Sequence, residues 1–208
     1  TELFTDFEKN NGLLELLRNK ELKIQHLHAL LNTLFHQVYM SSTSFALGGV
    51  CTDNRHHQVR EYFYSHAEEE QDHWKWIIQN LLDTGYTGPD PREVLPPQVT
   101  MSYLSFATYL ALKQPICRLA MGYILEGVSG ALGEKYGLMA VEQLDLKPEQ
   151  MSFFIQHGQL DKGHSEDILN VLKNASLTPY EWAWCVYAAE CTQSFYKAMY
   201  NEAASINL

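Results

Sequence analysis

The stretch LHALLNTLFHQV at residues 27–38 decides the fold class of this chain. Its apolar residues recur at steps of three and four positions, at Leu27, Leu30, Leu31, Leu34, Phe35 and Val38. Such spacing lines one face of an α-helix with apolar side chains. The same period recurs in LLELL at residues 13–17, and no comparable stretch alternates at period two. We therefore expect an all-α protein without a β-sheet.

Breaks in this helical pattern predict about seven helices in a single bundle domain spanning residues 1–208. Gly48 and Gly49 predict a first break, and four of the seven prolines fall in a loop at residues 86–97. Thr178 and Glu181, three residues apart, are typical of a capping box at a helix start. The expected helices cover residues 13–17, 27–38, 55–85, 101–114, 117–144, 148–174 and 181–203.

The composition narrows the function classes. The chain has 208 residues, with 25 Asp and Glu against 15 Lys and Arg, so its formal net charge is −10. Nucleic acids and anionic membranes are bound through clustered cations, so we expect neither as a partner. No run approaches the ~18 apolar residues of a membrane span, and residue 1 does not open a signal peptide. The four cysteines form no C-x-x-C pair, which predicts reduced thiols in a cytoplasmic protein.

The first chemical motif is H-x-x-x-D-x-x-H, formed by His157, Asp161 and His164. Offsets of four and three place these side chains on one stripe of a helix, with neighbouring Cβ atoms about 5 to 6 Å apart. Two imidazoles and a carboxylate on one stripe are typical metal ligands. A solvated polar helix face is the alternative. Gly158 and Gly163 cost stability inside a helix, so we expect a neighbouring helix or a substrate to approach closely there.

Two other helices supply further carboxylates. Glu70 and His73 form an E-x-x-H pair, by which bundle helices present two metal ligands from one turn, although for this short pattern alone a solvated acidic face is the better explanation. Glu126 interrupts an otherwise apolar helix. Because a buried charge requires a partner, we expect this side chain to face inward. Together the three helices offer three imidazoles and three carboxylates, a set suited to two iron or manganese ions.

These motifs resemble those of the haem-oxygenase-like diiron oxidases and oxygenases, which are related in fold to the TenA thiaminases and the PqqC oxidases. The resemblance covers residues 20–203 and is carried by EQDH at 70–73, Glu126 in its glycine-flanked helix, and HGQLDKGH at 157–164. It implies a seven-helix haem-oxygenase-like fold, often a homodimer, with two non-haem irons that activate O₂. The metal ligands it implies here are Glu70, His73, Glu126, His157, Asp161 and His164.

One position departs from the family pattern. These enzymes usually contribute another glutamate from an earlier helix, and this chain has no acid between Glu21 and Asp53. His36, in the segment LFHQV at residues 34–38, is our first candidate to replace it as a ligand. His66, one turn before Glu70, is the second candidate, and a weak or empty second metal site is the third possibility.

The leading hypothesis is a non-haem iron oxidoreductase that acts on a small organic substrate with O₂. Two alternatives remain open: a metal-free TenA-like hydrolase or PqqC-like oxidase, with Cys117 or Cys191 as nucleophile and Glu190 as partner, and a non-catalytic dimer that binds metal or ligand. The aromatic helix 181–203 is expected to be largely buried or to form the dimer surface. Arg118 is a candidate for binding a substrate carboxylate. Candidate pocket walls are Tyr103, Tyr109, Tyr123, Phe153 and Phe154, and the histidines expected in solvent are His26, His28, His56 and His57.

Overall fold

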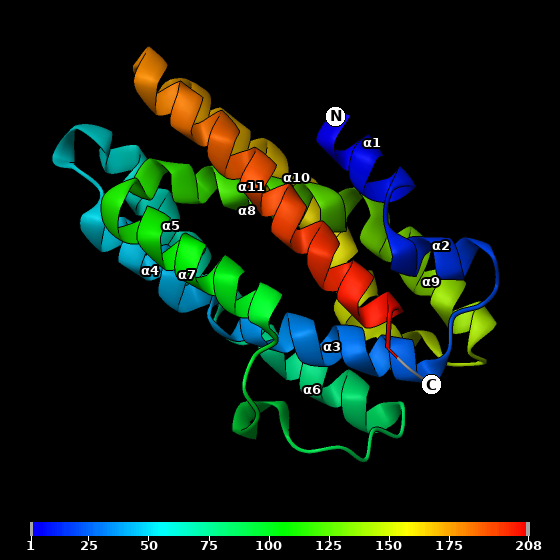
Figure 1. Ribbon diagram of the computed structural model, residues 1–208. Helices are drawn as coiled ribbons and strands as arrows, with labels where there is room; N and C mark the ends of the chain where they lie inside the picture. Colours follow the sequence, from blue (N-terminus) through cyan, green and yellow to red (C-terminus); the bar gives the residue numbers. More distant parts are fainter. Residues whose placement is uncertain (1, 207–208) are drawn as a thin grey trace.

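A computed structural model describes residues 2–206, apart from the side chain of residue 162, and every regular element in that range is helical (Figure 1). The α-helices are α1 (Glu2–Lys9), α2 (Gly12–Arg18), α3 (Ile24–Tyr39), α4 (Ser41–Cys51), α5 (His57–Glu70), α6 (Trp74–Asp83), α7 (Gln98–Lys113), α8 (Pro115–Val128), α9 (Glu134–Gln143), α10 (Ser152–Asn174) and α11 (Pro179–Ala204). A π-helical segment, Ser129–Gly133, joins α8 to α9, and short 3₁₀ turns precede α5, α7 and α10.

Helix α8 lies at the centre of the bundle, where it packs against α4, α7, α10 and α11 (Figure 1). Its sequence is apolar on nearly all sides, which is typical of a helix without a solvent face. Leu119, Met121 and Ile124 are fully buried. Glu126 is buried in the same helix, which confirms that this carboxylate faces inward. The acidic side chain that carries chemistry therefore lies in the core of the fold.

Several predicted helix boundaries are confirmed. Helix α7 ends immediately before the Gln114–Pro115 step, where α8 begins. Gly85 follows the end of α6 with a φ of +77°, a conformation that glycine adopts without strain. At the start of α11, the Thr178 backbone N–H donates to Glu181 Oε2, and the Glu181 N–H donates to Thr178 Oγ1. These polar and proline-containing boundaries are local, so the sequence encodes them directly.

Two expectations about breaks were wrong. Gly48 and Gly49 do not interrupt the chain, because α4 continues through both. Their missing side chains allow α5 to pack closely: a Cβ at Gly49 would lie 2.6 Å from the Tyr64 ring. Conversely, the helix expected at 55–85 is divided at residues 71–73. Around this break, backbone N–H groups donate to the carbonyl oxygen three residues earlier, as His73 does to Glu70, so the turn is tighter than an α-helix.

The surface departs from the sequence expectations in two further places. Helix α11 buries Tyr196 and Tyr200, but Tyr180 and Tyr187 in its N-terminal half are exposed, so one side of that half is open to solvent. His26 and His56 are buried rather than solvated. His26 accepts a hydrogen bond from the Lys23 backbone N–H at the start of α3, and His56 lies 3.6 Å from Glu181 Oε1.

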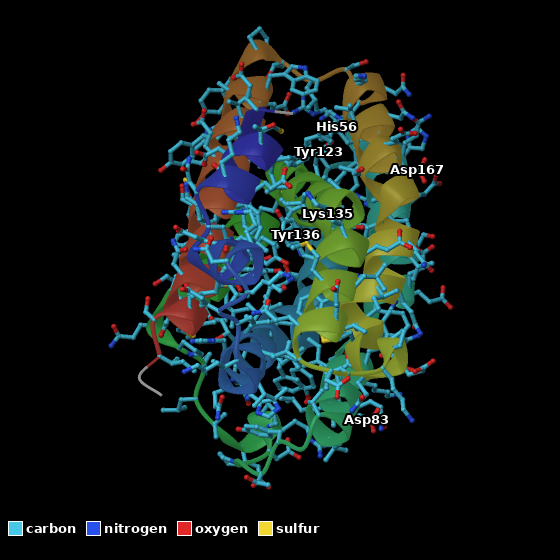
Figure 2. The ribbon with its side chains drawn as sticks, turned by 90° about the vertical axis from the view of Figure 1, so that its right-hand side faces the viewer. His56, Asp83, Tyr123, Lys135, Tyr136 and Asp167 are labelled. Carbon is cyan, nitrogen blue, oxygen red and sulfur yellow. The ribbon has the colours of Figure 1, made fainter. Side chains whose placement is uncertain are left out.

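Figure 2 shows Tyr136 of α9 beside the N-terminal helices. Among residues 2–206, no helix combines the length and the apolar character needed to cross a bilayer.

Candidate metal centre

Two groups of side chains in the described part of the chain have the composition and spacing of metal sites. The first, which we call the Glu126 group, consists of His66, Glu126 and His164. The second, the Glu70 group, consists of Glu70, His73 and His157. Within each group the ligand atoms lie within 4.8 Å of one another. Each group thus offers two imidazoles and one carboxylate, a mixture that suits iron and manganese.

Helices α5 and α10 each contribute one residue to the Glu126 group and another residue to the Glu70 group. On α5, His66 and Glu70 are one turn apart, and on α10, His157 and His164 are two turns apart. At a rise of about 1.5 Å per residue, these spacings correspond to about 6 Å and about 10 Å along the helix axes. The shared helices therefore place the two groups next to each other. Glu126 reaches the first group from α8, and His73 reaches the second from the turn after α5.

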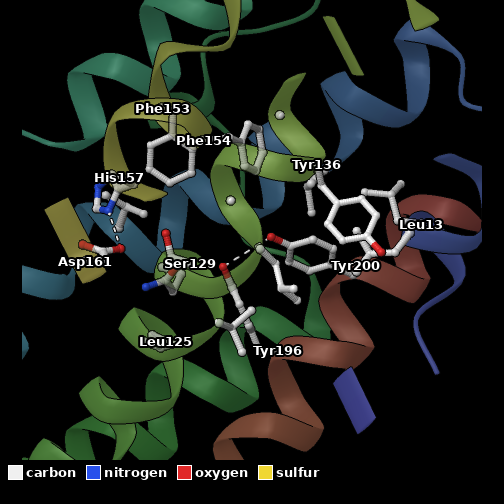
Figure 3. A pocket seen from close by; sticks show the side chains of 18 of the residues that line it. Leu13, Leu125, Ser129, Tyr136, Phe153, Phe154, His157, Asp161, Tyr196 and Tyr200 are labelled. Atoms are coloured by element: carbon white, nitrogen blue, oxygen red, sulfur yellow. Dashed lines mark hydrogen bonds and ion pairs between the residues drawn. The ribbon is translucent and has the colours of Figure 1, made fainter. Parts of the chain in front are cut away.

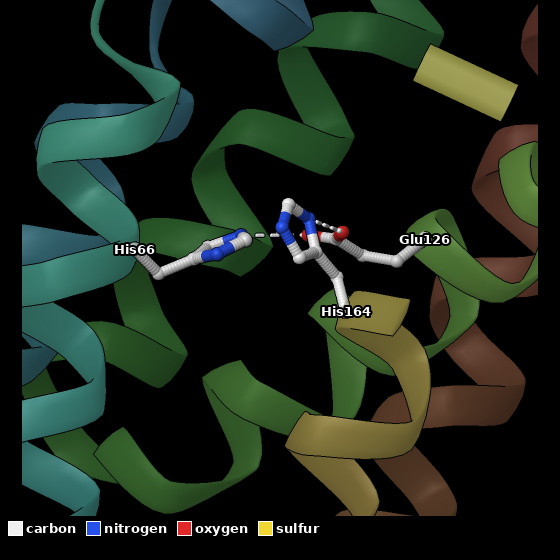
Figure 4. Close-up of side chains that lie close together, drawn as sticks. All are labelled: His66, Glu126 and His164. Carbon is white, nitrogen blue, oxygen red and sulfur yellow. Dashed lines mark hydrogen bonds and ion pairs between the residues drawn. The ribbon is translucent and has the colours of Figure 1, made fainter. Parts of the chain in front are cut away.

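In the Glu126 group the carboxylate is bonded on both sides (Figure 4). Oε1 accepts a hydrogen bond from His66 Nε2 at 2.7 Å, and Oε2 accepts one from His164 Nδ1 at 3.0 Å. The half-exposed carboxylate of Glu69 lies near the other nitrogen of each ring, at 3.6 Å from His66 and 3.5 Å from His164. This group is therefore a closed ion-pair cluster even without a cation.

The Glu70 group is less completely bonded. Glu70 Oε1 and His73 Nδ1 form an ion pair at 2.8 Å, although its angles are not those of a hydrogen bond. The Nε2 atom of His157 is buried without a partner. Trp76 stacks on the His73 ring with centroids 4.5 Å apart, and Phe153 lies 4.8 Å from the His157 ring, so aromatic side chains shield the group from water.

Asp161 links the two groups. Its Oδ2 accepts a hydrogen bond from His157 Nδ1 at 3.1 Å, and its Oδ1 lies 3.5 Å from His164 Nδ1. The hydroxyl of Ser129, in the π-helical segment, helps to lower the pKa of this carboxyl group. Because the hydrogen bond to Asp161 engages Nδ1 of His157, Nε2 is the atom available to a metal ion, as in a carboxylate–histidine–metal triad. Asp161 thus orients the ring of His157, and its own role as a direct ligand stays a prediction.

Opposing effects set the protonation of these residues. Burial lowers the pKa of His66, but the hydrogen bond to Glu126 and the negative charges of Glu126 and Glu70 together raise it above its ordinary value. Burial likewise opposes protonation of His157, whose pKa is raised by the hydrogen bond to Asp161 together with the nearby carboxylate charges. Bonds to Asp161 and Glu126 raise the pKa of His164 to about 10. Burial raises the pKa of Glu70, but His73 and His157 lower it below its ordinary range. The metal-free site thus holds protons in place of cations.

A cavity of about 90 Å³ adjoins the metal ligands (Figure 3). Glu70, Glu126, His157 and Asp161 contribute to its wall, with Gln37 and Ser41 nearby. Most of the remaining wall is leucine and aromatic side chains. Of the aromatic residues that we named as candidate walls, Phe153 and Phe154 line this cavity. Tyr103 is buried outside the lining, Tyr123 is half-buried, and Tyr109 is exposed.

The structure brings together most of the predicted ligands and leaves out one. Glu70, His73, Glu126, His157 and His164 join the two groups, and His66, our second candidate for the open position, completes the Glu126 group. His36 joins neither: it is half-buried on α3, with its ring 5.4 Å from that of Phe35. The next residue, Gln37, faces the cavity instead. We did not predict Glu69 or Ser129, and no spacing rule points to either residue.

The remaining candidates lie away from the cavity. Arg118 is fully buried, donates from Nε to Ser44 Oγ at 2.6 Å and stacks over Phe45 at 3.9 Å, but it does not line the cavity. The thiol of Cys117 is buried 3.8 Å from that of Cys185. The close approach expected at Gly158 is confirmed, because a Cβ there would lie 2.5 Å from the Glu134 backbone nitrogen. At Gly163 nothing lies within 4 Å, so no neighbouring helix approaches that position.

This chain is similar to solved structures, although its sequence matches no family model and no curated protein. A domain of unknown function with a haem oxygenase-like fold from Shewanella denitrificans superposes with a TM-score of 0.87 at 19% identity, over 97% of this chain and 87% of that one. A TenA homologue from Pseudomonas syringae pv. tomato gives a TM-score of 0.76 at 12% identity, over 98% and 90%.

A third structure, a CADD-like protein of unknown function from Nostoc punctiforme, gives a TM-score of 0.68 at 12% identity, over 98% of this chain and 94% of that one. At these identities the likeness concerns the fold alone. All three alignments include nearly the whole chain, so the helical order is shared from end to end. This chain therefore has the haem oxygenase-like, TenA-like fold.

Proposed function

We propose that this protein binds two divalent metal ions, iron in the first place and manganese as the alternative, and oxidises a small organic substrate with O₂. The observation that carries the proposal is the convergence of buried polar atoms at one end of the cavity: the Glu70 Oε1–His73 Nδ1 ion pair at 2.8 Å and His157, whose Nε2 has no hydrogen-bond partner, with the ligand atoms of the three residues within 4.8 Å of one another. Leaving a buried polar atom unsatisfied costs about 1–3 kcal/mol, which favours a ligand at this position. A cation fits, because one carboxylate and two imidazoles can present lone pairs to it.

The donor set also fits the proposed ions. Imidazole nitrogen and carboxylate oxygen together suit iron and manganese, and a pair of such ions supplies O₂-dependent oxidation chemistry. The chain's own residues hold and shield the ions. Asp161 fixes the ring of His157, while Trp76 and Phe153 exclude water from the Glu70 group. The adjoining cavity supplies the place for an organic substrate.

A cysteine-dependent reaction in the same fold receives less support. The bond from Cys185 and burial raise the pKa of the Cys117 thiol, which disfavours the nucleophilic thiolate. Neither Cys117 nor Cys191 lines the cavity. The proposed enzyme acts as a cytoplasmic homodimer without nucleic acid or membrane as a partner, as the sequence led us to expect.

Metal content and O₂ consumption test the proposal together. Chelator-treated protein is loaded with Fe(II) under nitrogen, desalted and analysed for iron, and O₂ uptake is then followed with a panel of small amines, amino acids and carboxylic acids. We expect two irons per chain and substrate-dependent O₂ uptake. His157→Ala and Glu126→Ala should each lose iron, while the control His57→Ala, an exposed histidine, should not. Full iron content in both ligand variants would refute the site, and iron without O₂ uptake would indicate a binding protein.

A further inference from the structure

We infer that the cavity beside the two groups binds the hydrocarbon part of a short amphiphilic substrate, whose polar end lies toward the metal ligands. The position of the polar end rests on the proposed function. The hydrocarbon site rests on the cavity alone, so it can be tested in protein that carries no metal.

The cavity has one polar end and one apolar end. Glu70, Glu126, His157 and Asp161 lie at the polar end. Figure 3 shows His157 and Asp161 on one side of the cavity, and Leu13 and Tyr136 on the other. The apolar end is formed by leucines of α2, of α3 and of the connection between them, namely Leu13, Leu14, Leu17, Leu22, Leu27 and Leu30. A ligand that fills the cavity is therefore apolar at the end farther from the carboxylates.

The middle of the cavity does not require a polar atom from the ligand. The hydroxyl groups of Tyr196 and Tyr200, which lie between the two ends in Figure 3, pair with each other at 3.4 Å. Burial raises the pKa of Tyr200 to about 12, and that of Tyr196 is also raised, so both hydroxyls stay uncharged at physiological pH. Because they satisfy each other, a hydrocarbon chain can pass them without stranding a polar group.

The volume of the cavity limits the length of this chain. A cavity of about 150 Å³ lined by apolar residues accommodates benzene, which has six carbons. The present cavity of about 90 Å³ is three-fifths of that size and accommodates about four carbons. Phe7 of α1 and the leucines of α2 close it on the N-terminal side. A longer chain must therefore displace α2, which costs part of the binding energy.

Half-exposed polar contacts help to hold this N-terminal cover in place. Lys135 Nζ donates to Glu8 at 2.7 Å, Lys197 Nζ donates to Asp6 at 2.8 Å, and the Gly12 backbone N–H donates to Asn201 Oδ1 at 2.7 Å. Such exposed pairs contribute little stability, and the cover is held mainly by buried Phe7, Leu13, Leu14 and Leu17. The position of this cover therefore sets the size of the apolar end.

A ladder of straight-chain probes tests the inference. Propanoate to decanoate and the corresponding 1-alkanols are titrated by calorimetry into metal-free protein and, under nitrogen, into Fe(II)-loaded protein. We expect the affinity to rise about fourfold for each added methylene until the cavity is full, near four to six carbons, and to level off afterwards. In loaded protein the carboxylates should bind more tightly than the alkanols of equal length, since the metals attract the anionic end.

Variants of residues that line the cavity should change, in opposite directions, the chain length at which the affinity stops rising. Leu17→Ala enlarges the apolar end and should extend the rise by two or three methylenes, whereas Ala140→Val should shorten it by about one. Leu110→Ala, a fully buried leucine outside the cavity, is the matched control and should leave it unchanged. Affinity that does not depend on chain length, or the same end point in all variants, would overturn the inference. If chain-length dependence persists while iron fails to bind, the proposed function is wrong and the hydrocarbon site stands.

Discussion

The Glu126 group and the Glu70 group contain the same kinds of ligand but differ in how their polar atoms are satisfied. Both oxygens of Glu126 accept hydrogen bonds from imidazoles, at 2.7 and 3.0 Å. In the Glu70 group, one ion pair joins Glu70 Oε1 and His73 Nδ1 at 2.8 Å, and His157 Nε2 has no partner. The first group is therefore fully paired without a cation, and the second is paired only in part.

This difference predicts the order in which the two groups fill. An ion that enters the Glu126 group must break two charge-assisted bonds, each contributing about 1.5–3 kcal/mol, and must displace the protons that hold them. An ion that enters the Glu70 group displaces one ion pair and satisfies His157 Nε2, which has no partner. We therefore expect the first ion to bind to the Glu70 group with the higher affinity, and the second to bind to the Glu126 group.

The largest expected effect concerns the stability of the metal-free protein. Glu126→Ala leaves His66 and His164 without their shared carboxylate, and breaking a buried pair in this way costs about 3–5 kcal/mol. Glu70→Ala breaks a single ion pair, that with His73, and should cost less, about 1–3 kcal/mol. Urea unfolding in the presence of a chelator measures both values. The two glutamates are equally buried, which matches the variants for lost packing. Equal losses of unfolding free energy would contradict the comparison.

Metal titration of the same variants should give the opposite ranking. Glu70→Ala should weaken binding of the first ion by more than about 100-fold, because loss of a direct ligand exceeds the effect of losing an outer partner. Glu126→Ala should leave the first ion in place and abolish the second. Anaerobic Co(II) titration followed by absorption spectroscopy resolves the two steps. If Glu126→Ala removes the first step instead, the order of filling is reversed.

Much of the fold and part of the site can be predicted from the sequence, because both depend on helical spacing. The H-x-x-x-D-x-x-H stripe places His157 and His164 two turns apart on α10, and capping residues define where α11 begins. His66 could be named only as one of two candidates, since its role depends on α8 bringing Glu126 to 2.7 Å from it. Ser129 lies in a π-helical segment that no period reveals. Gly48 and Gly49 predict the end of a helix that in fact continues through them, because a close contact between two helices leaves no local sequence pattern.

Asp161 provides a test of intermediate size, because it orients a ligand instead of completing a group. Asp161→Asn keeps the volume but weakens the acceptor for His157 Nδ1–H, and changes of this kind reduce metal affinity by about 10–100-fold. The first ion should be affected more than the second, because the Oδ2 atom bonds His157 at 3.1 Å, whereas His164 lies 3.5 Å from Oδ1. Ser129→Ala is the milder companion variant, because it removes only the hydroxyl that helps to lower the pKa of the Asp161 carboxyl group. Loss of both ions together would show that Asp161 is a direct ligand of each.

The smallest expected effect is a pH dependence of the metal-free protein. Asp161 and Glu126 raise the pKa of His164 to about 10, above its ordinary value of 6.5. A raised pKa in the folded state means that the stabilisation is complete below about pH 6.5 and is lost as the pH rises toward 10. The His164 ring is about one-fifth exposed, so solvent screening limits this contribution to about 1 kcal/mol. Urea unfolding with a chelator should therefore give a lower free energy at pH 9 than at pH 7, with a smaller decline in His164→Gln. Zinc-loaded protein, in which the ligating imidazole is neutral, should lose the decline, and its persistence would place His164 outside the metal site.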